Sequence, residues 1–141
     1  MTADSQTGPA PFLDLVPLLM CADVQASIPF YTDVLGFEVT GRDDDVGATG
    51  FAALANGRAR VMLASGTYVP EAQKVDGRYP QANYYFYVED AEALRRAVIE
   101  RGGRATECVK RFYGLLEFEV VDPDGHILLF GQDLQNADAT G

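Results

Sequence analysis

The sequence predicts an α+β protein made of two consecutive βαβββ modules. Each half of the chain shows a strand, a capped amphipathic helix and then three further strands with turn signals between them. The second half repeats the first at a constant offset, since Asp90 follows Asp23, and Phe130 follows Leu63, by 67 residues. A single module has too few strands to bury its sheet alone, so the modules must pack together, within one chain or exchanged between two chains.

The first module follows from local signals. Residues 13–20 form an apolar strand in which Pro17 indicates an edge position or a strand start. Asp23 is placed as the N-cap of a helix that ends at Gly36, with an apolar stripe made of Val24, Ile28, Tyr31, Val34 and Leu35. A strand begins at 37–40. Residues 51–54 and 59–64 form a hairpin around Asn56-Gly57, which is a type I′ turn signal.

The second module repeats this order. A strand at 84–88 precedes a helix that is capped by Asp90 and ends at Gly102-Gly103. Further strands are expected at 104–109, 115–121 and 127–130. The last two are joined by Asp122-Pro123-Asp124-Gly125, where proline, aspartate and glycine each favour a tight turn.

These elements divide the chain into two modules with three less regular segments. We expect a disordered arm at 1–11, the first module at 12–66 and a connector loop at 67–81. The second module is expected at 82–132, and a polar tail at 133–141.

Composition excludes several classes of protein. The 141 residues carry a formal charge of −10, with 21 acidic against 11 basic residues, whereas nucleic-acid binding needs a basic face. No apolar run approaches the ~20 residues that span a bilayer, so we expect no membrane partner. Two cysteines, Cys21 and Cys108, make no metal-ligand spacing, which favours buried thiols in a reducing cytoplasm. The acidity either attracts cationic small molecules or simply serves solubility.

Several segments, in this order and spacing, resemble the vicinal oxygen chelate superfamily of glyoxalases, bleomycin-resistance proteins and extradiol dioxygenases. In the first module they are Val16-Pro17-Leu18-Leu19, Ala22-Asp23-Val24 and Val34-Leu35-Gly36-Phe37. In the second they are Tyr85-Phe86-Tyr87-Val88, Arg101-Gly102-Gly103, Tyr113-Gly114, Glu117-Phe118 and Asp122-Pro123-Asp124-Gly125. The resemblance covers about residues 12–132. It implies that the curled mixed sheets of the two modules enclose a cavity, usually within a homodimer.

The resemblance also places the four metal ligands of the family. They fall on Val16, Met62, Asn83 and Leu129, of which only Asn83 offers an oxygen to a hard divalent ion. The single histidine, His126, is expected to be a solvent-facing turn residue. We therefore expect no metal and no other cofactor, and hence no Lewis acid for isomerisation or ring cleavage.

Strand alternation then selects the residues that line the cavity. Asn83, Tyr85 and Tyr87 should share a face, with Tyr84, Phe86 and Val88 packed on the helix. The predicted ligand-binding set is Asn83, Tyr85, Tyr87, Met62, Arg60, Glu117, Glu119, Tyr113, Phe112 and Tyr68. In the alternative interpretation the tyrosines merely pack the sheet, and Glu117 and Glu119 form structural ion pairs with Arg60 or Arg104.

The closest functional resemblance is to the metal-free bleomycin-resistance branch. It implies a homodimer that sequesters an aromatic or cationic small molecule in a cleft, and drug resistance as the outcome. The alternative is a metal-free enzyme acting on a small metabolite, in which Glu117 or Glu119, with a raised pKa, serves as acid or base. A structural or interaction module is a third alternative. No nucleophile–base pair is visible around Ser27 or Ser65, so covalent catalysis has no machinery.

Overall fold

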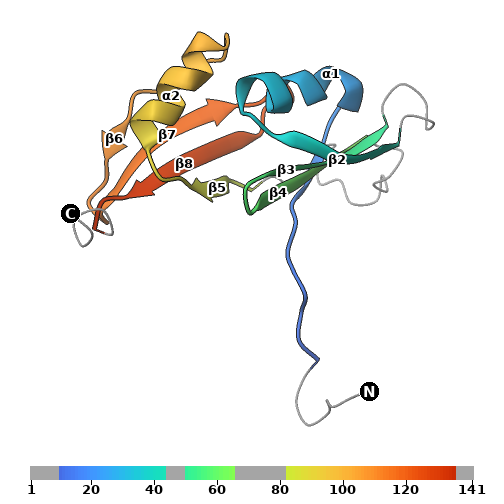
Figure 1. The fold of residues 1–141 in the computed structure, drawn as a ribbon, viewed down its shortest axis with the longest axis horizontal. Helices are drawn as coiled ribbons and strands as arrows, with labels where there is room; N and C mark the ends of the chain where they lie inside the picture. The colour runs from blue at the N-terminus through green and yellow to red at the C-terminus, as the bar shows by residue number, and fades with distance from the viewer. Residues whose placement is uncertain (1–9, 44–49, 66–81, 136–141) are drawn as a thin grey trace, which may run out of the picture.

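The computed structural model describes residues 10–43, 50–65 and 82–135, and it has the two predicted modules (Figure 1). The first module contains β1 (Leu18–Met20), α1 (Val24–Pro29), the π-helical turn η2 (Phe30–Val34), β2 (Glu38–Asp43), β3 (Phe51–Asn56) and β4 (Ala59–Ala64). The second contains β5 (Tyr84–Tyr87), α2 (Ala91–Glu100), β6 (Val109–Lys110), β7 (Leu115–Val121) and β8 (Ile127–Asp133). Each module forms one mixed four-stranded sheet, ordered β1-β4-β3-β2 and β5-β8-β7-β6. The predicted fold class is confirmed.

Strand register reproduces the repeat seen in the sequence. Leu19 pairs with Leu63 in the parallel β1–β4 ladder, and Phe86 pairs with Phe130 in the parallel β5–β8 ladder. Both caps form as predicted: the Asp23 side chain accepts hydrogen bonds from the backbone of Gln25 and Ala26, and that of Asp90 accepts one from Ala93. The two modules therefore correspond in strand order, in the pairing of their parallel strands and in their helix caps.

Three elements differ from the sequence prediction. The strand expected at 13–20 begins only at Leu18, and residues 10–15 extend away from the sheet as an exposed arm (Figure 1). Half-buried Val16 and Pro17 join the arm to the sheet, where Met62 N–H donates to the Pro17 carbonyl oxygen at 2.8 Å. The first helix changes to a π-helical turn after Pro29, because proline has no N–H to donate to the preceding turn. The strand expected at 104–109 is reduced to β6, since most of that segment passes from α2 to the sheet edge as irregular chain.

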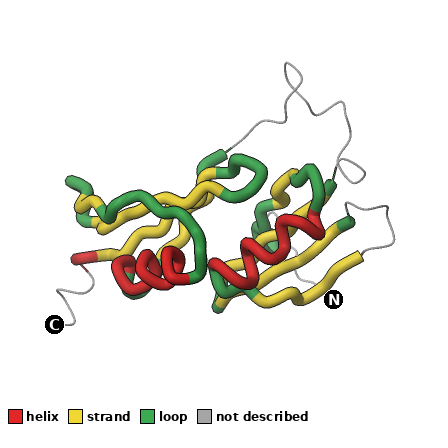
Figure 2. Tube along the Cα trace, turned by 90° about the horizontal axis from the view of Figure 1, so that it is seen from above, coloured by secondary structure: helices red, strands yellow, loops and turns green. Residues whose placement is uncertain are grey.

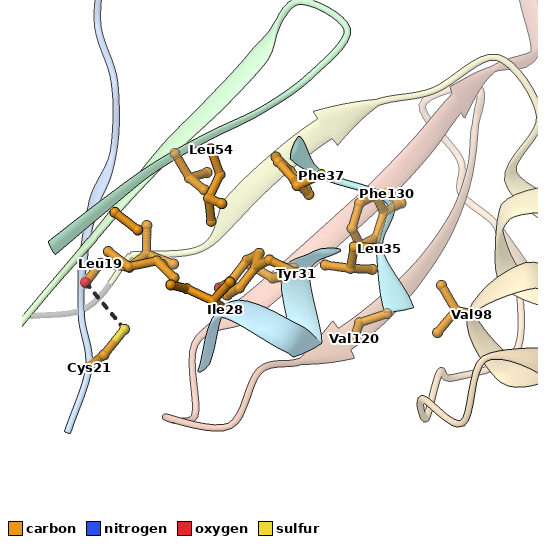
Figure 3. Packing of buried hydrophobic residues seen from close by; sticks show 14 of the residues in the cluster. Leu19, Cys21, Ile28, Tyr31, Leu35, Phe37, Leu54, Val98, Val120 and Phe130 are labelled. Atoms are coloured by element: carbon orange, nitrogen blue, oxygen red, sulfur yellow. Dashed lines mark hydrogen bonds between the residues drawn. The ribbon is translucent and has the colours of Figure 1, made fainter. Parts of the chain in front are cut away.

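Both helices lie on the same side of the two sheets, as Figures 1 and 2 show from perpendicular directions. Beneath them, buried residues of both modules form one hydrophobic core (Figure 3). Phe37 of the first module meets the ring of Phe86 of the second, with centroids 6.2 Å apart, and Phe86 stacks on Phe130 at 5.1 Å. The modules thus share a core within a single chain, a question that the sequence left open.

A polar contact set, the clasp, joins the modules at one seam. The β7–β8 turn carries Asp122, whose Oδ2 accepts a 2.6 Å hydrogen bond from the Tyr31 hydroxyl, and Asp124, whose Oδ2 accepts a 2.8 Å bond from Ser27 Oγ. Asp124 Oδ1 also accepts a hydrogen bond from the Ala22 backbone. Burial and the adjacent Asp122 carboxylate raise the pKa of Tyr31, so its hydroxyl remains a donor throughout the physiological range.

His126 belongs to the clasp, and the expectation that it faces solvent is wrong. Its side chain is only 5% exposed, and Nε2 donates to the Met20 carbonyl oxygen at 2.7 Å. Nδ1 has no hydrogen-bond partner among the described residues. The turn chemistry was predicted correctly, but the first module covers this turn, which local sequence does not reveal.

The remaining expectations concern cysteines and membranes. Cys21 is buried, and burial, followed by the charge of Asp124, raises the pKa of its thiol to about 12. Cys108 is half-buried, and both cysteines are free thiols. None of the helices in the described ranges has the length and apolar character needed to cross a membrane.

Candidate ligand-binding face

The candidate site lies on the face of the second sheet that points away from the helices. Along β5 the side chains alternate as predicted: Phe86 packs against the core, whereas Tyr85 is 37% and Tyr87 76% exposed. The two tyrosine rings are 5.2 Å apart. Adjacent exposed aromatic rings on one face of a sheet are candidates for contacts with a ligand or another protein.

Glu117 is the centre of this face. It lies in β7, it is only 3% exposed, and it accepts three hydrogen bonds. The Tyr85 and Tyr113 hydroxyls each donate to Oε2 at 2.7 Å, and Arg111 Nε donates to Oε1 at 3.0 Å. We call these four residues the Glu117 cluster.

The cluster keeps Glu117 ionised. Burial opposes the charged form of this carboxylate, but the hydrogen bonds from Tyr85, Tyr113 and Arg111, with the Arg111 charge, outweigh it and lower the pKa of Glu117. The same contacts act in the opposite sense on the donors: burial, followed by the Glu117 hydrogen bond, raises the pKa of Tyr85 to about 13. The raised pKa that the alternative, enzymatic interpretation requires of Glu117 or Glu119 is not found at Glu117, because its hydrogen bonds favour the anion.

A glycine makes the cluster possible. Tyr85 lies on β5 and Glu117 on β7, so the tyrosine side chain must cross the intervening strand β8, and it does so over Gly131. A Cβ at residue 131 would lie 2.6 Å from Tyr85 Cζ and closer still to its hydroxyl. Gly131 is thus a positioning residue for Tyr85.

The other predicted site residues are distributed over both sheets. Glu119 is half-buried on the same face as Glu117, and its N–H donates to Thr106 Oγ1 at 2.8 Å. Phe112 is almost fully exposed and contacts the ring of Tyr113. Asn83 is exposed just before β5, and half-buried Met62 lies opposite Leu18 in the first sheet. Tyr68 lies outside the described residues.

The expected ion-pair partners of Glu117 were wrong. Arg60 forms its ion pair with Asp14 of the arm, and Arg111 takes the position beside Glu117. Neither Arg111 nor Gly131 was selected from the sequence. The alternation of side chains along β7 predicts on which face of the sheet Glu117 lies. The neighbouring sequence does not show which arginine reaches that face.

In the part of the chain that the structure describes, a recess and a groove adjoin the face. A recess of about 230 Å³ is lined by Thr106, Glu107, Val109, Arg111, Glu117, Phe118 and Glu119. A larger groove, of about 890 Å³, lies between the modules and includes Tyr85 and Tyr87 together with the β3–β4 turn. The groove is within the size range of small-molecule sites.

The positions that the resemblance assigns to metal ligands do not fit a divalent ion. Val16, Met62 and Leu129 have no donor atom suited to a hard cation, and Asn83 is exposed. Within residues 10–43, 50–65 and 82–135, no three His, Cys, Asp or Glu side chains come close enough to hold a metal together.

Comparison with solved structures gives the same fold. TioX from Micromonospora sp. ML1 matches with a TM-score of 0.72 at 22% identity, over 87% of this chain and 100% of that one. A bleomycin-binding protein from Streptomyces verticillus, solved with copper(II)-bleomycin, matches with a TM-score of 0.61 at 27% identity, over 86% and 96% of the two chains. A lactoylglutathione lyase from Agrobacterium tumefaciens matches with a TM-score of 0.67 at 19% identity, over 91% and 98%.

Sequence comparison assigns the family. A search of curated protein sequences gave no match. The family model of the Glyoxalase/Bleomycin resistance protein/Dioxygenase superfamily matches residues 14–130, which is most of the chain. The protein therefore belongs to the glyoxalase/bleomycin resistance protein/dioxygenase superfamily.

Proposed function

We propose that this protein binds and sequesters a small aromatic cation on the helix-free face of its second sheet, without metal and without catalysis. The observation that carries this proposal is the Glu117 cluster. A nearly buried carboxylate is held in its anionic form among tyrosine side chains, three of its acceptor sites being occupied by Tyr85, Tyr113 and Arg111.

The surroundings of Glu117 suit a cation with an aromatic body. Tyr87 and Phe112 present exposed rings, and aromatic faces attract cations by about 0.5–2 kcal/mol. Glu119 borders the adjoining recess and adds negative charge to it, whereas Glu107, also in its lining, is paired with Arg95 at 2.8 Å. The formal charge of −10 favours the approach of such a ligand.

The lowered pKa of Glu117 favours binding over acid–base chemistry. A general acid or base works best with a pKa near the operating pH, which for a glutamate requires a raised value. Glu117 is shifted in the opposite direction. Its carboxylate is therefore better suited to supply a fixed negative charge than to exchange a proton.

The likeness to the bleomycin-binding protein suggests the biological setting. That protein was solved with copper(II)-bleomycin, and it is 27% identical to this chain. We infer that this chain holds an antibiotic-like molecule out of solution and so gives drug resistance. Its two free thiols suit the reducing cytoplasm, where we place it.

We further propose that a second copy completes the cleft. Leu18 on the first sheet, and Tyr87, Val109 and Val121 on the second, are exposed. The arm at residues 10–15 adds exposed Phe12, Leu13 and Leu15. A symmetric homodimer would bury this apolar surface and give two equivalent clefts.

Calorimetry tests the binding proposal. Bleomycin and smaller aromatic cations are titrated into the protein, alongside neutral aromatic molecules of the same shape. We expect heat and saturable binding only for the cations, weakening as salt is raised. Equal affinity for the neutral analogues, or no binding of any of these compounds, would contradict the proposal.

A further inference from the structure

The two seams between the modules differ, although the repeat makes them equivalent. At one seam the β7–β8 turn reaches the first module and fills the contact with the clasp residues Asp122, Asp124 and His126. At the other seam the β3–β4 turn, Asn56-Gly57-Arg58, faces the end of β5 and the start of α2 across the 890 Å³ groove. The sequence explains the difference, because Asp122 and Asp124 correspond to Ala55 and Gly57 at the 67-residue offset and those residues offer no carboxylate.

One wall of the groove is a strand edge. β5 is the first strand of its sheet, with β8 on one side and no described strand on the other. Val88 N–H donates to the Gly131 carbonyl oxygen, so the backbone groups of Phe86 and Val88 point to β8. Because successive residues alternate, the backbone N–H and C=O groups of Tyr85 and Tyr87 point into the groove.

The side chains along this edge form two different faces. Toward the helices the groove is apolar, lined by Leu35, Phe37, Phe86, Leu94 and Phe130. On the other face lie the Tyr85 and Tyr87 rings, and the exposed Glu89 follows them. Across the groove stands exposed Arg58, which makes no ion pair or hydrogen bond with any described residue.

We propose that the free edge of β5 binds a short extended peptide-like molecule as an added strand. The edge amides of Tyr85 and Tyr87 pair with its backbone, and its alternate side chains are apolar toward Phe86 and Leu94. The side chain between them is cationic and lies against Tyr87 and Glu89. This inference deepens the proposed function, on which it rests, by naming a peptidic class of ligand and a site beside the Glu117 cluster.

The dimensions agree with this ligand. A strand advances about 3.3 Å per residue, so the four residues of β5 accommodate a partner segment of three or four residues. The groove volume of about 890 Å³ also suits a molecule of that size. Arg58 is placed to donate hydrogen bonds to a carbonyl or carboxylate oxygen at one end of such a ligand.

The test uses the full-length protein and the probe acetyl-Phe-Lys-Phe-amide, followed by amide NMR and calorimetry. We expect chemical-shift changes at Tyr85, Tyr87 and Gly57. We also expect at least a tenfold loss of affinity when every backbone nitrogen of the probe is methylated, which removes its edge hydrogen bonds and keeps its side chains. The probe acetyl-Phe-Glu-Phe-amide should bind more weakly, and Glu89→Lys should reverse that preference.

The outcomes separate this inference from the proposed function. Three results would each overturn the peptide site alone. The first is equal affinity for the methylated probe, and the second is chemical-shift changes confined to β7. The third is no binding of the probe while an aromatic cation still binds near Glu117. A self-association that the probe relieves would show that a second copy occupies the edge, and would also overturn it. Loss of cation binding on Glu117→Gln with the probe still bound would support both.

Discussion

The Tyr85 hydroxyl donates a 2.7 Å hydrogen bond to Glu117 Oε2 from two strands away, and it can do so only because Gly131 lies beneath its ring. This contact connects the edge strand β5 to the centre of the sheet. It also links the two hollows, because Tyr85 lines the groove and Glu117 lines the recess.

The first prediction concerns Gly131. Replacing Gly131→Ala should displace Tyr85, because the new Cβ would overlap its ring, and should lower the free energy of unfolding by about 1.5–3 kcal/mol, the usual contribution of a hydrogen bond to a charged group. Urea denaturation of Gly131→Ala, Tyr85→Phe and the double variant gives the coupling free energy between residues 85 and 131. The two costs should be strongly non-additive. Additive costs would show that Gly131 does not act through Tyr85.

The second prediction concerns pH. The folded-state pKa of Glu117 is lowered, so its ionised form contributes stability above its unfolded pKa of about 4.3, and this stability is lost as pH falls through the lower folded value. Wild type should therefore exceed Glu117→Gln in stability at pH 7, with the difference shrinking below about pH 4. Denaturation curves of wild type and Glu117→Gln, recorded between pH 7 and pH values below about 4, measure this difference in stability. A difference that grows on acidification would mean that Glu117 is protonated in the folded protein.

The third prediction tests the clasp. Tyr31→Phe removes the 2.6 Å hydrogen bond to Asp122 and leaves that buried carboxylate with one donor fewer, which should cost about 1–3 kcal/mol. The matched control is Tyr87→Phe, whose hydroxyl is on an exposed side chain and which should change stability by no more than about 0.5 kcal/mol. Thermal or urea unfolding distinguishes the two. Equal costs would show that the clasp does not stabilise the pairing of the modules.

The fourth prediction concerns assembly. Light scattering at micromolar concentration should give the mass of a homodimer. Leu15→Asp, in the exposed arm, should weaken it, because a charge would enter the apolar contact. Arg104→Gln, at an exposed position between α2 and β6, lowers the net charge by the same amount and is the control for the change of charge. A monomer that still binds ligand would show that one chain builds the whole cleft.

Local signals in the sequence predicted the modular fold well. The N-caps Asp23 and Asp90, and the glycines that end the helices, act through neighbours a few residues away, and strand alternation placed Tyr85 opposite Phe86. The 67-residue repeat then predicted that both modules have the same order of elements.

What the sequence did not show depends on contacts between distant segments. His126 reads as a turn residue, yet the first module buries it through Met20. Arg111 could not be distinguished from Arg60 or Arg104 as the partner of Glu117, because that choice depends on how β6 and the following turn approach β7. The direction of the pKa shift at Glu117, which the enzymatic alternative takes as upward, depends on distant contacts too, since its three donors come from β5 and from the segment before β7.

The most direct test of the account is the affinity of an aromatic cation for wild type, Glu117→Gln and the control Glu100→Gln at the far end of α2, by calorimetry. Circular dichroism checks that each variant is folded, and Tyr87→Ala provides a second, exposed change on the same face. Loss of a charged hydrogen-bonding partner costs about 1.5–3 kcal/mol, so Glu117→Gln should weaken binding about 10- to 100-fold, while Glu100→Gln leaves it unchanged. Undiminished affinity in both folded variants, Glu117→Gln and Tyr87→Ala, would contradict a ligand site built around Glu117.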